Sequence, residues 1–490
     1  MFTSGVNHVF FHGAAYSPKE AAWPGWKFYA AIDMSPANSI WRDAPAFFDY
    51  ITRIQSFLQN GNPDNDFLLY YPIHDIWYEK RGNYYLPFAI HDVLHELTQF
   101  NETVENIRKS GFDADYISDA FLQNTTVENG ALKTPGGTIY KALILPSVKQ
   151  MPIETITHIN QLAKQGAAII FIGKFPEDVP GLFRLEERRK IFDEIMQQVS
   201  SQPTVIETND YDYLSSRYNK ESFITDFGGQ MIRRKYDDGF LYFFTMSDNH
   251  PVDNWVPLAT RAKSALFFDP MTGRKGKALL RNNQGNTEVY MQIRPGESVI
   301  LKTFTDKDVR ADSWAYYQAT GIVMELKTGW KMRFVESEPE VKEIFQLPKL
   351  ISWTELNNDT LKKNMGTARY EIQFDFRKDN SKEYRLCLGD VRESAVVTVN
   401  GHDAGTVFAV PFEINIGDML KTGKNTIEID VTNLPANRIA DYDRRGVEWR
   451  IFNEINFVDI AYKNVRYDTW APVPSGLLGP VIIQCFSYPY

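Results

Sequence analysis

Apolar residues first gather in a short run near the start of the chain and then recur at helical spacing. The run "VNHVFFHG" (6–13) has the length of a β-strand and ends in a glycine. A long loop follows, and after it come the apolar residues Phe47, Ile51, Ile54 and Leu58. Their spacing predicts a helix, which Asp43 can cap and which ends before Gly61. Residues 1–62 are therefore one βα unit, which is too small to have a core of its own.

Strand-like and helical runs then alternate up to about residue 205. The runs that predict strands lie at 67–72, 113–118, 140–146 and 167–173. The helical patterns lie at about 90–110 and 153–166. Continuous apolar strands that alternate with helices are typical of a parallel sheet covered on both faces. We therefore predict a flavodoxin-like α/β domain over residues 63–205.

From residue 206 the pattern becomes that of antiparallel β structure. Turn sequences such as Asp237-Asp238-Gly239 separate short strands, which predicts a small β-sandwich over 206–305. Residues 306–320 look like a connector. The remaining residues, 321–490, are again rich in strands, and Asn400-Gly401 is a strong hairpin signal. We predict a larger sandwich of the jelly-roll type there, so the fold class is multidomain, α/β plus all-β.

The composition is that of a soluble globular chain with several domains. Its 490 residues exceed one domain of roughly 150 residues, and 43% are hydrophobic against 23% charged. A net charge of −9 without a basic patch argues against a nucleic-acid partner. No apolar run approaches the ~20 residues of a membrane span, and the start lacks the features of a signal peptide. Cys387 and Cys485 are predicted to be buried free thiols, unless their strands are neighbours and allow a disulfide.

Aromatic and polar residues are concentrated between residues 12 and 41. Sugars present apolar C–H faces and many hydroxyls, which aromatic rings and polar side chains can recognise. The candidate sugar contacts are His12, Trp23, Trp26, Tyr29, Asn38 and Trp41. The alternative interpretation is structural: a histidine that satisfies a local hydrogen bond and tryptophans that pack the loop against its neighbours.

A second set of candidates follows the first strand of the α/β domain. His74, Asp75 and Trp77 come just past its carboxyl end, where open α/β sheets bind ligands. Here the alternative is a domain seam that touches no ligand. The polar-aromatic stretch with Arg444 and Trp449 has the same ambiguity, and a salt-bridged loop is the favoured interpretation there.

Several strings in the chain resemble one known family. "GVNHVFFHGAAYSP…WPGW" and "DFLLYYPIHDIWYE" are similar to the large bacterial α-L-rhamnosidases of glycoside hydrolase family 106. "VTVNGHDAGTVF" is less specific, because many galactose-binding-like domains share it, including those of family 2 β-galactosidase relatives. The resemblance covers essentially the whole chain. It implies an exported glycosidase about twice this length, which removes terminal α-L-rhamnose from oligosaccharides or polysaccharides.

The resemblance also implies where the catalytic groups lie. Glycoside hydrolysis needs two carboxyl groups, here in an inverting arrangement, at strand ends of a (β/α)₈ barrel. Residues 1–62 would be the C-terminal end of that barrel, but their strand ends in His12-Gly13, and Glu20, Asp33 and Asp43 are poor catalytic candidates. The catalytic pair is therefore expected on a missing N-terminal barrel portion, upstream of Met1, and no catalytic residue is assigned.

The resemblance further implies bound Ca²⁺, although no stretch has EF-hand-like spacing and no metal ligand is placed. Two other functions stay open. One is a non-catalytic carbohydrate-binding or scaffold protein. The other is a β-galactosidase-like exo-glycosidase, since a fold does not fix its substrate.

Overall fold

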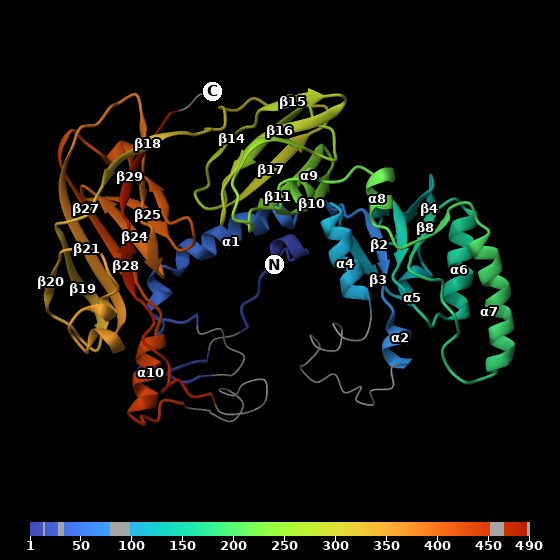
Figure 1. The fold of residues 1–490 in the computed structure, drawn as a ribbon, viewed down its shortest axis with the longest axis horizontal. Helices are drawn as coiled ribbons and strands as arrows, with labels where there is room; N and C mark the ends of the chain where they lie inside the picture. Colours follow the sequence, from blue (N-terminus) through green and yellow to red (C-terminus); the bar gives the residue numbers. More distant parts are fainter. Residues whose placement is uncertain (13–14, 28–33, 79–98, 451–464, 488–490) are drawn as a thin grey trace.

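The α/β part of the chain is a five-stranded parallel sheet with helices on both faces. The computed structural model describes residues 1–12, 15–27, 34–78, 99–450 and 465–487 (Figure 1). The strand order is β3-β2-β7-β8-β9, and each neighbouring pair is parallel. The five strands are β2 (Phe67–Tyr70), β3 (Ala114–Ile117), β7 (Ala142–Leu145), β8 (Ala168–Ile172) and β9 (Val205–Thr208). Counted along the chain, this is the doubly wound order 2-1-3-4-5.

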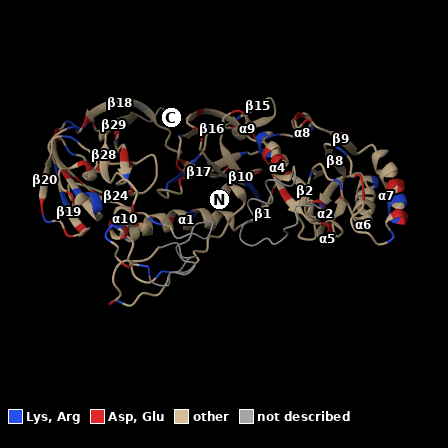
Figure 2. Cartoon of the chain, turned by 60° about the horizontal axis from the view of Figure 1, so that its bottom comes forward, with Lys and Arg blue, Asp and Glu red and all other residues tan. Residues whose placement is uncertain are grey.

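Alternate side chains of these strands enter two separate cores. Leu68 and Tyr70 pack with Ile156 and Phe192 on one face, whereas Phe67 packs with the helix at 100–109 on the other. The helices are α2 (Ile73–Tyr78), α4 (Phe100–Lys109), α5 (Asp119–Leu122), α6 (Ile153–Lys164), α7 (Leu185–Ser200) and α8 (Asp212–Arg217). Charges of both signs alternate along α7 at the outer edge (Figure 2).

A small sheet that the sequence pattern did not indicate interrupts this alternation. Its strands are β4 (Thr126–Glu128), β5 (Ala131–Lys133) and β6 (Ile139–Tyr140), which pair antiparallel between α5 and β7. Strands of two or three residues carry too few positions for a period to be recognised. Within the described residues the predicted helix at 90–110 is α4, and residues 90–98 lie outside the described ranges.

The middle of the chain is antiparallel β structure. One sheet has the order β1-β10-β11-β17-β13-β14 and the other the order β12-β16-β15. The bounds are β1 (Asn62–Pro63), α9 (Ser222–Thr225), β10 (Gln230–Tyr236), β11 (Gly239–Thr245), β12 (Val252–Pro257), β13 (Ser264–Phe268), β14 (Lys275–Lys277), β15 (Leu280–Asn283), β16 (Asn286–Ile293) and β17 (Ser298–Phe304). One apolar core joins residues of both sheets, among them Tyr242 and Met291.

The C-terminal part holds two larger antiparallel sheets that enclose one core. Their orders are β20-β19-β21-β27-β24-β25 and β18-β29-β22-β26, and β23 pairs with β28. The bounds are β18 (Gln318–Glu325), β19 (Trp330–Glu338), β20 (Ile344–Leu347), β21 (Met365–Phe376), β22 (Glu383–Cys387), β23 (Asp390–Arg392), β24 (Ser394–Val399), β25 (His402–Val407), β26 (Glu413–Asn415), β27 (Gly423–Thr432), α10 (Ala436–Arg444), β28 (Gly476–Gly479) and β29 (Ile482–Ser487). β18 begins inside the predicted connector.

Two local predictions in this part are confirmed. Asn400 and Gly401 have φ angles of 52° and 82°, and they join the antiparallel strands β24 and β25. A positive φ at both central residues is the type I′ hairpin turn that this dipeptide favours. Cys387 and Cys485 are free and buried. They lie on the paired strands β22 and β29, but Cys387 is opposite Ile482 and Cys485 is opposite Tyr384, so the two thiols are out of register.

The strand predicted at 6–13 is wrong for the described residues 6–12, which form no β-pairing. A strand needs a neighbouring backbone for its N–H and C=O groups. Here the backbone N–H of Val9 instead donates to the Gln55 side chain, and the carbonyl of Asn7 accepts from Gln59. The predicted helix is confirmed as α1 (Ala44–Leu58).

The buried face of α1 packs on the middle sheet. Ile54 and Leu58 pack against Ile232 of β10, Phe243 of β11 and Ile300 of β17. Complete burial of a side chain of this size stabilises a protein by about 1.5–3 kcal/mol. This contact attaches the N-terminal segment to the antiparallel part of the chain (Figure 1).

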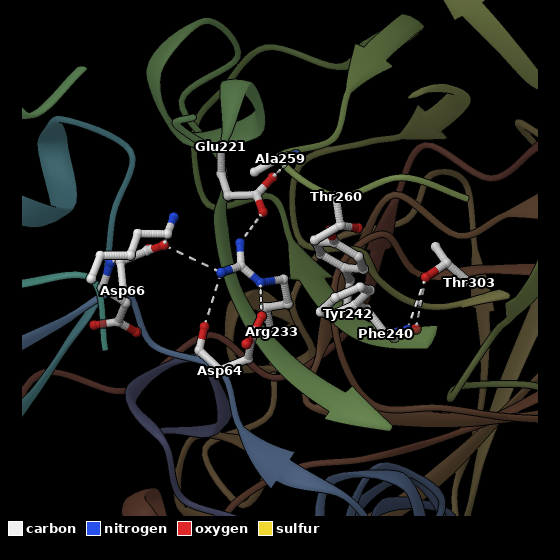
Figure 3. A network of polar contacts seen from close by, with 11 residues as sticks. Asp64, Asp66, Glu221, Arg233, Phe240, Tyr242, Ala259, Thr260 and Thr303 are labelled. Carbon is white, nitrogen blue, oxygen red and sulfur yellow. Dashed lines mark hydrogen bonds and ion pairs between the residues drawn. The ribbon is translucent and has the colours of Figure 1, made fainter. Parts of the chain in front are cut away.

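A buried ionic cluster joins the parallel sheet to the middle sheet (Figure 3). Arg233 of β10 donates to Asp64 at 2.5 Å, to Glu221 at 2.5 Å and to Asp66 at 3.3 Å. Lys141 also contacts Asp66, at 2.6 Å. Burial raises the pKa of Glu221, although Arg233 opposes this. A cavity of about 370 Å³ lies beside the cluster, and Asp64, Asp66, Glu221 and Arg233 form part of its lining.

Among the described residues, no helix has the length and apolar character needed to cross a membrane.

Candidate functional site

Helix α2 lies where the order of strands in the parallel sheet reverses. Tyr70 is the last residue of β2, and α2 begins three residues later at the carboxyl edge of the sheet. β2 is the first strand of the sheet along the chain, with β3 on one side and β7 on the other. Ligands of open α/β sheets bind at such a reversal. The predicted residues His74, Asp75 and Trp77 all lie on α2.

Asp75 connects α2 to the loop that follows β7. Its two carboxylate oxygens accept the backbone N–H of Lys149 at 2.8 Å and of Gln150 at 2.7 Å. Burial raises the pKa of Asp75, and these two hydrogen bonds oppose the rise. Both carboxylate oxygens of Asp75 accept hydrogen bonds that join α2 to this loop, so the role of Asp75 in this arrangement is structural.

His74 and Trp77 form the polar and aromatic surface of α2. Their rings are perpendicular, with centroids 5.4 Å apart. The Trp77 side chain is exposed, at 62% of its full surface. Nε2 of His74 lies 3.5 Å from Oδ2 of Asp119, the first residue of α5. An exposed indole beside a fixed imidazole can contact an apolar sugar face and a hydroxyl together.

Of the tryptophans in the N-terminal segment, Trp23 packs on the C-terminal part of the chain. The indole N–H of Trp23 donates to the carbonyl of Ala37 at 2.9 Å, and its ring meets Tyr442 of α10 edge-on, with centroids 5.4 Å apart. The backbone N–H of Trp26 donates to the Ser17 hydroxyl at 2.8 Å, and about a third of the Trp26 side chain is exposed.

The remaining candidates of this segment have mixed outcomes. Asn38 caps a short 3-10 helix, η2 (Ser39–Arg42), by accepting from the N–H of Ile40. Trp41 is partly exposed and meets Phe48 of α1 edge-on. His12 is exposed, and Tyr29 lies outside the described residues. The structure therefore gives Asn38 a structural use and leaves Trp26, Trp41 and His12 accessible.

The segment after these tryptophans is attached to the sandwich of the C-terminal part. Arg42 contacts Asp430 of β27 at 3.3 Å. Asp43, predicted as a helix cap, makes no capping hydrogen bond; it accepts from the hydroxyl of Ser394 in β24 at 2.5 Å. Burial raises the pKa of Asp43. The tertiary contact with Ser394 replaces the local cap.

The described part of the polar-aromatic stretch, up to Arg450, is held by salt bridges, in line with the favoured interpretation. Asp443 accepts from the indole N–H of Trp449 at 2.7 Å and pairs with Arg450 at 2.8 Å. Arg445 pairs with Asp441 at 2.9 Å, and Arg444 donates to the carbonyls of two residues in the segment after 464. These contacts fix α10, which carries Tyr442, against the residues that follow it in the chain.

The candidate residues thus divide into two groups. His74 and Trp77 lie on α2, at the parallel sheet, whereas Trp23 contacts α10, which lies on the other side of the molecule from α2 (Figure 1). Sequence reasoning missed Asp119 and Tyr442. Asp119 follows the end of β3, so the strand-end rule that selected His74 could have found it. Nothing local to Tyr442 indicates that it meets Trp23.

The described residues bring together no group of three or more His, Cys, Asp or Glu side chains arranged to hold a metal ion. None of them is therefore assigned to the Ca²⁺ that the family resemblance implies.

Comparison with known proteins identifies the relatives of the chain. Residues 1–279 match the model of the α-L-rhamnosidase family, glycoside hydrolase 106. A rhamnosidase from Novosphingobium sp. PP1Y has a similar fold, with a TM-score of 0.73 and 20% identity over 99% of this chain and 45% of its own. A protein of Formosa agariphila with the provisional name beta-glucuronidase is 26% identical over 313 residues, 61% of this chain. The chain spans 24% of the length of that relative.

Proposed function

Because the chain belongs to the α-L-rhamnosidase family, we propose that it is part of a glycoside hydrolase that removes terminal α-L-rhamnose from complex glycans. The observation that carries the proposal is the family match over residues 1–279, which includes both the N-terminal tryptophans and α2. The reaction uses two carboxyl groups across the glycosidic bond, in an inverting arrangement.

We propose that the two groups of candidate residues contact different parts of the glycan. Trp23, Trp26 and Trp41 offer aromatic surface, and Trp26 and Trp41 are partly exposed. Trp77 offers a second exposed ring, with the imidazole of His74 beside it. Aromatic rings favour the apolar face of a sugar, and an imidazole can exchange hydrogen bonds with its hydroxyls.

We propose that the catalytic pair comes from a barrel portion outside these 490 residues. Two facts support this. The chain spans 45% of the length of the similar rhamnosidase. In addition, two carboxylates of these segments, Asp43 and Asp75, accept hydrogen bonds from Ser394 and from backbone N–H groups. In this proposal residues 1–62 are the C-terminal end of that barrel.

The finer division into domains is also a proposal. A flavodoxin-like unit at 63–205 is supported by the strand order of the parallel sheet. A β-sandwich at 206–305 and a galactose-binding-like jelly roll at 321–490 are supported by two pairs of antiparallel sheets, each with its own core.

Hydrolysis of an aryl α-L-rhamnoside tests the proposed function. The 490-residue chain is compared with a protein extended upstream by the adjoining coding sequence. We expect release of the aryl group by the extended protein only. Activity of the 490-residue chain alone would overturn the placement of the catalytic pair. Cleavage of an aryl β-galactoside or β-glucuronide but not of the rhamnoside would overturn the substrate.

A further inference from the structure

Four elements meet around the carboxylate of Asp119. Its Oδ1 accepts the hydroxyl of Tyr70 at 2.8 Å and the hydroxyl of Thr155 at 2.6 Å. Its Oδ2 lies 3.5 Å from Nε2 of His74. Tyr70 ends β2, His74 is on α2, Asp119 begins α5 and Thr155 is in the first turn of α6. All four residues lie at the carboxyl edge of the parallel sheet.

The surroundings keep this carboxylate charged and in one place. Tyr70 and Thr155 are almost completely buried. Burial alone would raise the pKa of Asp119, but hydrogen bonds from His74, Thr155 and Tyr70 outweigh burial and lower it. Hydrogen bonds to an ionised acceptor are stronger than those between neutral groups. Asp119 is thus a fixed anion with one oxygen facing α2.

The contact with Asp119 fixes the orientation of the His74 imidazole through its Nε2 atom. With Nε2 directed at Asp119, Nδ1 is the ring nitrogen left for a ligand. The perpendicular Trp77 ring borders the same imidazole. A group that anchors the second nitrogen of a functional histidine sets its tautomer and its orientation.

We propose that Asp119 is a positioning residue of the sugar site on α2, which fixes the imidazole of His74 beside Trp77 so that both contact one rhamnose unit. This rests on the proposed function, because it assigns α2 to the glycan. Asp119 does not touch the sugar; it acts through His74, so its effect on binding requires that histidine.

A double-mutant cycle on sugar binding tests this relation. Binding of methyl α-L-rhamnoside to the 490-residue chain is measured by calorimetry for the wild type, Asp119→Ala, His74→Ala and the double variant. Loss of one hydrogen bond weakens binding by about five- to tenfold. We expect each single variant to lose about that much, and the double variant to bind no worse than His74→Ala.

A matched control separates positioning from stability. Asp115 lies on β3 and accepts the hydroxyl of Tyr140 at 2.6 Å and the Asn65 side chain at 2.8 Å. Asp115→Ala should lower the melting temperature and leave sugar binding unchanged. Where Asp119→Ala fails to fold, Asp119→Asn keeps the side-chain volume and enters the same cycle.

Three results would overturn the inference. The first is an Asp119→Ala variant that binds the glycoside with wild-type affinity. The second is a double variant whose loss of affinity equals the product of the two single losses, because Asp119 would then act independently of His74. The third is a wild-type chain that does not bind the glycoside, which would show that α2 carries no sugar site. Hydrolysis by the extended protein with unchanged binding in these variants would reject the inference and leave the proposed function standing.

Discussion

Arg233 shows how much can depend on a single side chain. It is the cation shared by Asp64, Asp66 and Glu221, and it is itself almost completely buried. Removing one partner of a buried ion pair leaves an uncompensated charge and costs about 3–5 kcal/mol. We therefore expect Arg233→Met to lower the free energy of unfolding by about that amount, measured by urea denaturation.

A matched change on the surface serves as the control for that experiment. Arg184 pairs with Glu187 at 3.6 Å, and more than half of each side chain is exposed. Exposed ion pairs contribute about 0–1 kcal/mol, so Arg184→Met should change stability little. Equal losses in the two variants would contradict the role assigned to the buried cluster.

Asp443 gives a prediction about acid stability. Burial would raise its pKa, but hydrogen bonds from Arg450, Tyr467 and Trp449 lower it below the ordinary value of 3.8. A carboxyl whose pKa is lower in the folded state contributes stability that is fully present above the unfolded pKa. That contribution is lost as the pH falls through the folded pKa. The stability difference between wild type and Asp443→Asn should therefore shrink below about pH 4.

Urea denaturation of both proteins between pH 6 and pH 2 would measure this difference. A gap that stays constant across the range would show that Asp443 contributes through packing and not through its charge.

The positions of individual candidate residues were predictable only where a backbone rule pointed to them. His74 and Trp77 were predicted to follow the end of a buried strand and they do so on α2, and the same rule reaches Asp119 after β3. The sequence suggested a sugar contact for Asn38 and a helix cap for Asp43. The residues that each side chain contacts in the fold give it a different role. Asn38 caps η2, and Asp43 meets Ser394, a residue far away in the chain.

For whole elements, a periodic pattern predicted helices better than strands. The helix α1 was predicted because its own residues show which face is buried. The run at 6–13 had strand composition, but strand formation depends on a partner, and the described residues 6–12 have none. The strands of the parallel sheet are buried on both faces and have such partners, which is why their runs were assigned correctly.

The turn between β24 and β25 allows a clean test of backbone strain. Gly401 has a φ of 82°, and a Cβ placed there would meet no atom within 4 Å. A substitution therefore changes conformational energy without a clash. We expect Gly401→Ala to cost about 1 kcal/mol of unfolding free energy.

Gly136 is the control for this turn, because a Cβ there also meets nothing within 4 Å and its φ is outside the left-handed range. Gly136→Ala should be neutral within measurement error in the same urea titration. An equal loss at both positions would mean that strain is not the cause.

At the scale of the whole molecule, a contact between distant parts of the chain holds Trp23. Trp23 meets Tyr442 edge-on, and Arg438 and Arg445 lie on the Tyr442 ring at 4.6 Å and 5.2 Å. An aromatic pair contributes about 0.5–1.5 kcal/mol beyond its burial, so Tyr442→Ala should reduce amide protection near Trp23 by about tenfold.

Hydrogen exchange of residues 15–27 measures that protection. Tyr442→Phe keeps the ring and should behave as the wild type. Unchanged protection in the alanine variant would mean that the other contacts, such as that of Arg42 with Asp430, suffice to hold the segment. This interaction could not be predicted from sequence, since the two residues come from opposite ends of the chain.

The reactivity of the two thiols in the C-terminal sandwich can report the partial unfolding of that sandwich. Both are buried and out of register, and burial raises the pKa of Cys387 to about 12. Thiolate is the reactive form, so a disulfide reagent should label Cys387 only when the sandwich opens. Because both cysteines lie in the sheets of the C-terminal part, the labelling rate would follow the opening of that part separately from the rest of the chain, without an introduced dye.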